Sequence, residues 1–409
     1  MRQQNLFSQF LSRRATLKTI AFGSVGYLTS ALGACATDSP TVAQSASPID
    51  LPTPTPTEAG GIEIGTLEVV AELPIRPTAV VLNSQGRMFT TVHWFDRQEP
   101  QMIEVTDRTT YRPFPDEQWN RGFGQGNDAF NQPLGMVIDR QDRLWLADCG
   151  IFPVVNDGNP PLPAQSPRLL AFDSKTGQNV FNLALPQDIC PPGTYPQDLA
   201  VDEVNEFAYM ADIGATRQPA IVAINLKTQQ VRRFEAHPSL AAENVDLRLE
   251  GKSLTFPDAA GSVQAARIGI NPITLSADKD TLFFGPMCGL GWYSVPATLF
   301  RDNANDQAIA AAIQRVANKP VCNGATTDAS GNHFLTNLSE NAIDKIDAQG
   351  IITRVVQDDR IIWGEGFHIA ANGWMYTGVN QLNRSPLFNG GQEQGQSPYL
   401  ILRVWTGTR

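Results

Sequence analysis

The sequence lacks the short motifs that identify most enzyme classes from a single chain. It has no Gly-x-Ser-x-Gly elbow, no phosphate-binding loop, no HExxH pair and no dinucleotide fingerprint. No Cys-x-x-Cys or mixed cysteine and histidine spacing indicates a zinc site. Histidine is rare as well, and we interpret all four residues as structural because they are scattered along the chain: His93, His237, His333 and His368.

Basic residues are scarce. The chain carries 31 Lys and Arg against 41 Asp and Glu, and four of the basic residues fall within the first 34 positions. The rest of the chain therefore has 27 basic and 41 acidic residues, a formal net charge of −14 with histidine neutral. Such a surface repels nucleic acid, so we expect no nucleic-acid partner. It tolerates cationic ligands and metal ions.

No long hydrophobic run is suited to a membrane-spanning helix. Residues 19–34 are apolar but short and rich in Gly and Ser, and they follow the twin arginine Arg13-Arg14. This arrangement is typical of twin-arginine export signals, and the sequence ending at Cys35 resembles a bacterial lipobox. We predict that residues 1–34 are a lipoprotein signal peptide and that Cys35 is lipidated. The alternative is an ordinary cleaved signal peptide.

A second atypical segment, residues 35–61, separates this signal from the rest of the chain. Alternating Pro and Thr at 52–57 disfavours both helix and sheet, and little apolar surface is available to bury. We predict a Pro/Thr/Ser-rich tether, with residues 62–409 forming one folded domain. The expected location is the periplasmic side of a bacterial cell envelope or the extracellular space. We expect the protein to contact the membrane through the lipid anchor only. The sequence predicts no oligomeric state.

Cysteine is also scarce, with only four residues besides Cys35. An even number of cysteines in an exported protein favours disulfide bonds. Three pairings are possible, and we predict Cys149–Cys190 with Cys288–Cys322 because each would join adjacent repeats. Four buried thiols are the alternative.

One short pattern recurs six times: apolar residues, a polar turn and then a strand carrying an aromatic residue. The six aromatics are Phe89, Trp145, Tyr209, Phe283, Phe334 and Tyr376. They are 56, 64, 74, 51 and 42 residues apart, which is typical of a β-propeller with one such hairpin per blade. We therefore predict an all-β, six-bladed propeller in which these aromatics form the core.

Further strands complete the blades in this prediction. Second hairpins are indicated at 168–183, 220–234 and 342–356, so each blade would have four antiparallel strands. Strands at 64–73 and 398–405 would share one blade and close the ring. Helical spacing predicts one helix between 302 and 319.

Polar side chains flank the predicted inner strands and would converge at the channel. They are Asp198, Asn323 and Glu365 before the strands, and Asp148, Asp212, Asn337 and Asn380 after the aromatics. Such oxygens could hold Ca²⁺ or another divalent cation. They could equally bind an ammonium group beside an aromatic face from Trp292, Tyr293, Trp363 or Phe367. The alternative is that these side chains only bond to turn backbones.

The folded part resembles the Yellow and major royal jelly protein family. The resemblance rests on an ordered series of segments: 67–70, 76–77, 86–89, 113–115, 142–150, 169–173, 198–202, 208–212, 282–284, 292–296, 374–376 and 380–382. It implies a six-bladed, usually secreted propeller. Some relatives are associated with dopachrome isomerisation, some insect salivary relatives bind biogenic amines in the channel, and many have no established activity.

Three functions are therefore open at the level of sequence. The leading hypothesis is a lipid-anchored propeller that binds a small aromatic or cationic molecule in its channel. If it is an isomerase of the dopachrome tautomerase kind, Asp198 or Glu365 would serve as the catalytic base. A metal-dependent lactonase similar to gluconolactonase and regucalcin would use Asp198, Asn323 and Glu365 as metal ligands. A non-catalytic module that docks another envelope protein is the third possibility.

Overall fold

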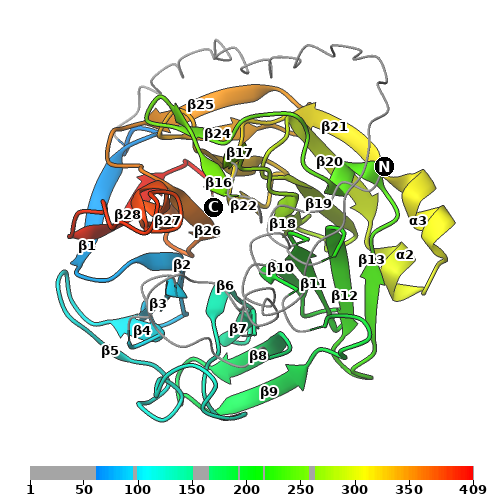
Figure 1. Ribbon diagram of the computed structural model, residues 1–409, viewed down its shortest axis with the longest axis horizontal. Coiled ribbons are helices and arrows are strands. Elements are labelled where there is room, and N and C mark those ends of the chain that lie inside the picture. Colours follow the sequence, from blue (N-terminus) through cyan, green and yellow to red (C-terminus); the bar gives the residue numbers. More distant parts are fainter. Residues whose placement is uncertain are drawn as a thin grey trace, which may run out of the picture.

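The computed structural model describes residues 61–94, 99–150, 165–191, 194–214, 217–257 and 263–408. Within these residues, six four-stranded antiparallel sheets are arranged around a central axis, as Figure 1 shows. The prediction of an all-β, six-bladed propeller is thus confirmed. The predicted signal peptide, the lipidation site Cys35 and almost all of the tether lie outside the described residues.

The first three blades follow one another along the chain, each running from the channel outward. Blade 1 consists of β2 (Pro77–Leu82), β3 (Met88–Val92), β4 (Met102–Val105) and β5 (Tyr111–Pro113). Blade 2 consists of β6 (Pro133–Ile138), β7 (Arg143–Asp148), β8 (Arg168–Asp173) and β9 (Asn179–Ala184). Blade 3 consists of β10 (Pro196–Asp202), β11 (Phe207–Asp212), β12 (Ala220–Asn225) and β13 (Val231–Phe234).

The remaining blades complete the circle. Blade 4 consists of β18 (Ile270–Leu275), β19 (Thr281–Pro286), β20 (Gly291–Pro296) and β21 (Gln314–Asn318). Blade 5 consists of β22 (Ala325–Thr327), β23 (His333–Asn337), β24 (Ala342–Ile346) and β25 (Ile352–Gln357). Blade 6 consists of β26 (Gly364–Ile369), β27 (Trp374–Val379), β28 (Tyr399–Trp405) and β1 (Leu67–Leu73). The inner strands β2, β6, β10, β18, β22 and β26 each contact the next, and β26 contacts β2.

Blade 6 combines both ends of the folded chain. Strand β1 pairs antiparallel with β28, from Leu67 opposite Val404 to Leu73 opposite Tyr399. The side chains of Glu68 and Arg403 form a salt bridge of 2.6 Å across this pair. The predicted closure of the ring by the two terminal strands is confirmed, and it removes the open edge that each strand would otherwise present.

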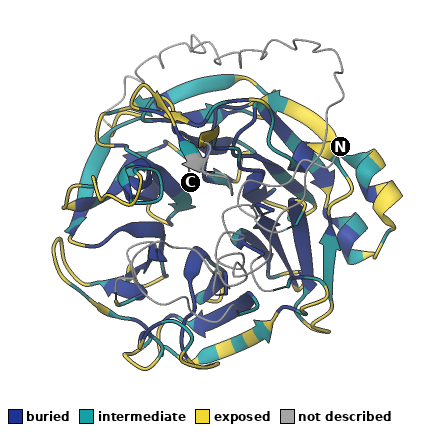
Figure 2. Ribbon diagram, viewed as in Figure 1, coloured by how far each residue is buried: buried dark blue, intermediate teal, exposed yellow. Residues whose placement is uncertain are grey.

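The repeated aromatics pack between blades. Each of the six residues contributes to a different interblade cluster, so that every one of the six interfaces contains one of them. Five are buried, and Phe283 is half-buried. Figure 2 shows the same distribution for whole strands: the second strands β3, β11, β23 and β27 are buried, whereas the outer strand β9 alternates between half-buried and exposed residues. The repeat is therefore the core of the fold, as predicted.

The turns inside the six inner hairpins share one backbone feature. A residue with positive φ lies three positions before the repeated aromatic in five blades and four positions before it in blade 4. Glycine fills this position in blades 1, 5 and 6, as Gly86, Gly331 and Gly373. Blades 2, 3 and 4 instead have charged residues there, Asp142, Glu206 and Lys279. A residue with a Cβ atom is strained at such φ values by roughly 1 kcal/mol, so these three positions carry a conformational cost.

Helices are short and peripheral. The helix predicted between 302 and 319 is α3 (Asp306–Ala312), capped by the Asn305 side chain, which accepts a hydrogen bond of 2.9 Å from the Ala308 N–H. It follows α2 (Thr298–Arg301), and the 3-10 turns η4 (Pro238–Leu240) and η5 (Leu382–Arg384) lie elsewhere. The prediction was wrong beyond residue 313, because that part forms the outer strand β21 of blade 4. In the described part of the chain, no helix has the length and hydrophobicity needed to cross a membrane.

The predicted disulfides are not formed. Cys149, Cys190, Cys288 and Cys322 are all free and buried. Neither predicted pair shares a hydrophobic cluster, since Cys149 and Cys190 lie in two different clusters and so do Cys288 and Cys322. Burial raises the pKa of Cys190 to about 12 and that of Cys288 to about 11. These thiols are therefore small, protonated packing groups, which was the alternative interpretation.

Candidate functional site

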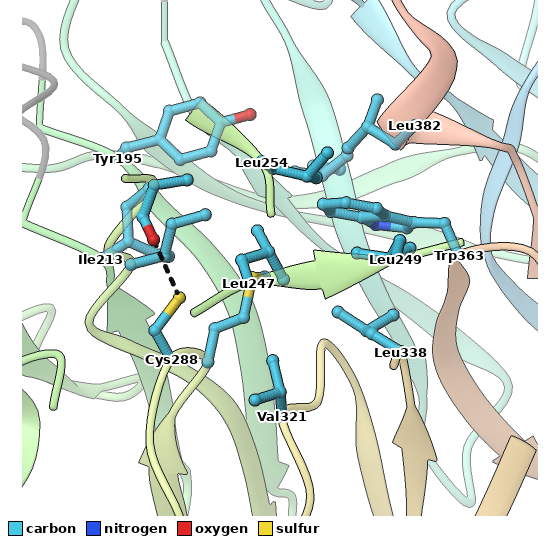
Figure 3. Close-up of a cluster of buried hydrophobic side chains, with 14 of the residues drawn as sticks. Tyr195, Ile213, Leu247, Leu249, Leu254, Cys288, Val321, Leu338, Trp363 and Leu382 are labelled. Carbon is cyan, nitrogen blue, oxygen red and sulfur yellow. Dashed lines mark hydrogen bonds between the residues drawn. The ribbon is translucent and has the colours of Figure 1, made fainter. Parts of the chain in front are cut away.

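One end of the channel is closed by apolar side chains. Residues 245–254 leave the repeat and include the hairpin of β14 (Arg248–Leu249) and β15 (Lys252–Ser253); we call this segment the plug. Leu247, Leu249 and Leu254 of the plug are buried. Side chains from all six blades or their adjoining loops pack around them in one cluster: Trp94, Leu134, Tyr195, Ile213, Met287, Val321, Leu338, Trp363 and Leu382. Figure 3 shows the part of this cluster in which side chains of blades 3 to 6 surround the plug.

The rest of the channel is a cavity of about 390 Å³. Its wall contains residues from the inner strands of all six blades, and the turns of blades 2 to 5 line the end opposite the plug. The side chains of the plug are absent from this lining, which reaches the turns of blades 2 to 5. We call the two ends the plugged end and the turn end.

Asp198 is the acidic residue that lines the cavity close to the plugged end. It lies in β10 of blade 3, and its Oδ1 accepts a hydrogen bond of 3.0 Å from the Leu199 N–H. No salt bridge to Asp198 is found among the described residues. Protein surrounds the carboxyl group, and this burial raises its pKa to about 8, with a further contribution from the charge of Glu365. At neutral pH the group is therefore mostly protonated.

Glu365 lies behind the cavity wall in β26 of blade 6. Its Oε2 accepts a hydrogen bond of 2.7 Å from Asn323 Nδ2, and its Oε1 accepts one of 2.6 Å from Asn380 Nδ2. Burial raises the pKa of Glu365 to about 7, because the loss of solvation outweighs these two amide donors. The structure thus brings three of the predicted site residues into direct contact.

The contact extends further as a chain of carboxamides. Asn323 Oδ1 accepts a hydrogen bond of 2.6 Å from Asn271 Nδ2, and Asn271 Oδ1 accepts one from Gln197 Nε2. Gln197 belongs to blade 3, Asn271 to blade 4, and Asn323 precedes β22 of blade 5. With Glu365, the chain crosses four blades. All of its donors point in one direction, toward the Glu365 carboxylate, so it supports a negative charge at that end.

The metal-site interpretation can be tested on this geometry. A divalent cation needs the carbonyl oxygens of the carboxamides as ligands. Here Asn323 and Asn380 direct their N–H groups at Glu365, and their oxygens accept hydrogen bonds from Asn271 Nδ2 and from the Leu382 N–H. Across the described residues, no group of three or more His, Cys, Asp and Glu side chains is arranged to hold a metal ion. The donor set of Asp198, Asn323 and Glu365 therefore does not fit a metal.

Three other candidates hold strand ends and do not line the cavity. Asp148 pairs with Arg168 and accepts hydrogen bonds from the N–H groups of Asn131 and Gln132. Asp212 pairs with Arg233 at 2.6 Å and accepts hydrogen bonds from the N–H groups of Tyr195 and Gly214. Asn337 donates a hydrogen bond of 2.8 Å to Asp344. Asp148 and Asp212 thus hold backbone N–H groups and an arginine in place, and Asn337 holds a neighbouring carboxylate. This is close to the alternative interpretation, in which these side chains bond to turn backbones and do not bind a ligand.

Of the four aromatics considered for ligand contact, only Phe367 lines the cavity. Trp363 packs against the plug, and Trp292 is buried in the interface with blade 5. Tyr293 packs on the interface with blade 3. One of the four aromatics therefore lines the wall, on blade 6, where it also packs on the interface with blade 5.

His368 is the residue that sequence reasoning missed. It follows Phe367 in β26 and lines the cavity, and its Nε2 is buried without a hydrogen-bond partner in the described residues. Burial lowers its pKa to about 4, so the ring is neutral at physiological pH. Blade 6 stands opposite blade 3 in the ring, so His368 and Asp198 lie on facing walls. Its position in the sequence could have indicated a role at the channel. His368 interrupts the apolar run of an inner strand, whereas the other three histidines do not.

Comparison with known proteins identifies a family. The family model described as "Major royal jelly protein" matches residues 133–376. Major royal jelly protein 2 of Apis mellifera is 24% identical over 233 residues, which cover 53% of this chain and 46% of that protein. Major royal jelly protein 3 of Apis mellifera is 24% identical over 254 residues, covering 59% of this chain and 42% of that protein. The chain thus spans somewhat less than half the length of the curated relatives it matches.

Solved structures of other propellers are more distant. A gluconolactonase from Xanthomonas campestris aligns with a TM-score of 0.49 and 12% identity, over 83% of this chain and 89% of that chain. Virginiamycin B lyase from Staphylococcus aureus aligns with a TM-score of 0.46 and 12% identity, over 83% of this chain and 98% of that chain. TM-scores below 0.5 at 12% identity carry no argument about the activity of this protein. The family model, in contrast, covers more than half of the chain, and the protein therefore belongs to the major royal jelly protein family.

Proposed function

We propose that this protein is an exported, lipid-anchored propeller that binds a small aromatic or cationic molecule in its channel and catalyses a proton shift on it. The observation that carries the proposal is Asp198, a carboxyl group without a salt bridge in the described residues, on the wall of a cavity of about 390 Å³. A cavity of this size suits a ligand with one aromatic ring. Phe367 provides an aromatic contact on the facing wall.

Asp198 has the acidity that general acid–base catalysis requires. A group with a pKa of about 8 is ionised in roughly one molecule in ten at pH 7, so it can both accept and return a proton. In a tautomerisation, the ionised carboxylate would remove the proton from the carbon beside a carbonyl group. The same carboxyl group would then return that proton to another atom of the ligand. No atom or electron is gained or lost.

His368 would act on the opposite side of the ligand. Its neutral ring has a buried Nε2 without a partner in the described residues, and a buried polar atom of this kind favours a ligand that completes its hydrogen bonding. Depending on the tautomer, Nε2 would donate to the carbonyl oxygen or accept from a hydroxyl group. Glu365 does not line the cavity, so we assign it to the support of the wall and keep Asp198 as the base.

The catalytic part is tested with an aromatic 2-keto acid whose enol form absorbs in the ultraviolet. We expect the rate of enol-to-keto conversion to rise about tenfold per pH unit from pH 6 and to level off above pH 8. Asp198→Asn should lower the rate by about 100-fold, while Asp188→Asn, an exposed control outside the cavity, should not change it. Equal rates for Asp198→Asn and the wild type would show that Asp198 is not the base.

The binding part is tested by calorimetry with a cationic aromatic amine. Its ammonium group would favour the ionised form of Asp198, so its affinity should increase between pH 6 and pH 8. A neutral ligand with the same ring should show no such increase. An amine that binds with a pH-independent affinity would argue that the ammonium group does not reach Asp198.

Export and anchoring are tested separately, in cells. Cys35→Ser should move the protein from the membrane fraction to the soluble envelope fraction, because no lipid could be attached. Replacing Arg13 and Arg14 with Lys should retain the full-length precursor in the cytoplasm. A Cys35→Ser protein that stays with the membrane would contradict the lipid anchor.

A further inference from the structure

The chain enters the folded domain at the turn end of the channel. Strand β1 pairs with β28 from Leu67 opposite Val404, and Val404 lies opposite Met375, the second residue of β27. Strand β27 begins directly after the inner turn of blade 6, so Leu67 lies at the turn end. The Gly65 N–H donates a further hydrogen bond of 2.8 Å to the Trp405 carbonyl oxygen, which continues the pairing. The chain before Gly65 therefore approaches the domain at this end.

Exposed apolar side chains gather at the same end. Seven large hydrophobic residues are exposed in the part of the chain that the structure describes, and five of them lie at the turn end: Ile62, Ile64, Val180, Val204 and Ile351. Of the other two, Val316 lies midway along β21, and Val263 belongs to β17 (Val263–Ala265), outside the blades. Single exposed apolar residues are normal on a protein surface, so the informative observation is their shared location.

The aliphatic residues are distributed around this end of the ring. Ile64 precedes β1 and lies beside Gly407, where an added Cβ atom would meet the Ile64 side chain at 3.0 Å. Val204 is in the inner turn of blade 3 and is 65% exposed. Val180 follows the outer turn of blade 2 as the second residue of β9, and Ile351 directly precedes β25 of blade 5. Blades 2, 3, 5 and 6 thus each contribute an aliphatic side chain to this end.

The predicted lipid attachment site is close to this end along the chain. Residues 36–60 separate Cys35 from Gly61, the first residue that the structure describes. A lipid on Cys35 would hold the domain near a bilayer by the end at which the chain enters. Contacts that are too weak to recruit a free protein can then orient the domain, because the attachment makes them intramolecular.

The charge of the turn end distinguishes between lipid surfaces. The turns at this end carry more acidic than basic residues, as those at 139–142, 203–206 and 276–280 illustrate. A bilayer rich in anionic lipid would repel such a face, whereas a bilayer of zwitterionic lipid would not. A membrane contact at this end therefore depends on apolar groups, and these are the side chains found there.

We propose that the turn end is a membrane-docking face, which contacts a bilayer surface of zwitterionic lipid through its aliphatic side chains. The inference rests on the lipid anchor of the proposed function and is independent of the channel ligand and of catalysis. Each aliphatic side chain that enters the headgroup region loses contact with water, and the anchor at Cys35 keeps the face within reach of the bilayer. The plugged end then faces away from the membrane.

The test uses the full-length lipidated protein in phosphatidylcholine vesicles that contain a lipid with a nitroxide on its headgroup. A fluorophore is attached to one introduced cysteine, at the turn end in Gln85→Cys or Gln349→Cys and at the plugged end in Lys252→Cys; all three positions are exposed. The four native free thiols are buried and do not compete for the label. We expect the nitroxide to quench the turn-end labels about threefold more strongly than the label at the plugged end.

Serine variants show whether the aliphatic side chains cause this orientation. Val204→Ser combined with Ile351→Ser should reduce the quenching of the Gln85→Cys label by roughly half, because two apolar contacts are lost. Val263→Ser changes a residue that is 67% exposed but away from the turn end, and as the matched control it should leave the quenching unchanged. Vesicles of phosphatidylglycerol should give less quenching than phosphatidylcholine at low salt, and the difference should shrink as salt is added.

The outcomes separate this inference from the proposed function. If the protein sediments with the vesicles but all three labels are quenched equally, the docking face is overturned and the lipid anchor stands. If the mature protein carries no lipid and does not sediment, the anchor fails and the docking face fails with it. Selective quenching that survives both serine changes would assign the orientation to the attachment alone and overturn the role of the aliphatic side chains. Selective quenching that the serine changes reduce supports the docking face.

Discussion

The two ends of the channel are built by the same six blades and yet have opposite chemistry. At the plugged end, all six blades contribute apolar side chains to one cluster around Leu247, Leu249 and Leu254. At the turn end, the turns of blades 2 to 5 place charged residues in the cavity lining, among them Arg140, Glu203 and Lys279. The plugged end resembles a protein core, in which every position is used for packing. At the turn end, blades 2, 3 and 4 have a charged residue at the position of positive φ, where glycine would carry less strain. Departures of this kind from the favoured residue are expected at functional or strained sites.

The largest effect is expected at the plugged end. Leu247→Ala removes a fully buried side chain from the centre of the plug and should lower the free energy of unfolding by about 3 kcal/mol, measured by urea denaturation. Val204→Ala, at a residue that is 65% exposed, should change it by less than about 0.5 kcal/mol. If both variants are equally stable, the plug is not part of the cooperative fold.

A smaller loss is expected between the two ends, at the carboxamide chain. Glu365→Gln has one acceptor oxygen for the two amide donors Asn323 and Asn380, so one donor meets another N–H group. We expect a loss of about 2 kcal/mol in the free energy of unfolding. Glu117→Gln, at an exposed site, should be neutral. A neutral Glu365→Gln would mean that the chain of carboxamides rearranges.

The free energy of unfolding should depend on pH because the pKa of Asp198 differs between the folded and unfolded states. Its pKa is about 8 in the folded state and 3.8 in the reference state, so the folded state binds the extra proton between these values. Stability from this group is complete below about pH 4 and is lost as pH rises to 8. Asp198→Asn should remove this part of the slope and be more stable than the wild type at pH 8. Parallel stability curves would contradict the raised pKa of Asp198.

The smallest effect is expected at the rim of the turn end. Lys279→Gly relieves the strain of a positive φ but gives the unfolded chain more freedom, so its stability should change by less than about 1 kcal/mol. Lys279→Ala keeps the strain without the ammonium group and should be the less stable of the two by thermal denaturation. The opposite order would show that the turn is not strained by its side chain.

The sequence predicts the parts of the structure that repeat. Six aromatics with nearly the same offset from a turn indicate six equivalent environments, and each of them lies in its own interblade cluster. The shared blade was predictable because a strand at each end of the chain would otherwise have an open edge. Asn323, Glu365 and Asn380 were predictable as a group because a ring brings equivalent positions together, and they are in contact.

The parts that do not repeat were not predictable. The plug occurs once in the chain, so the alternation of apolar and charged residues at 245–249 has no second copy that would identify it as a repeated element. Its position at the end of the channel follows only from its contacts with residues distant in the sequence. The cysteine pairs failed because adjacency along the repeat does not bring two sulfur atoms into one cluster. His368 was missed because a single histidine in an apolar strand is usually a packing residue, and the cavity beside it is a property of the closed ring.

The pairing of β1 with β28 has a mechanical consequence. The chain enters the folded domain at β1, the outermost strand of blade 6, whose first pair is Leu67 with Val404. A pull on the segment before Gly65 would load the hydrogen bonds of Gly65 and Thr66 with Trp405 first and then the pairs of β1 with β28 in turn, as in opening a zipper. Peeling of this kind needs less force than sliding strands past one another. A ring pulled through this strand would therefore begin to open at blade 6.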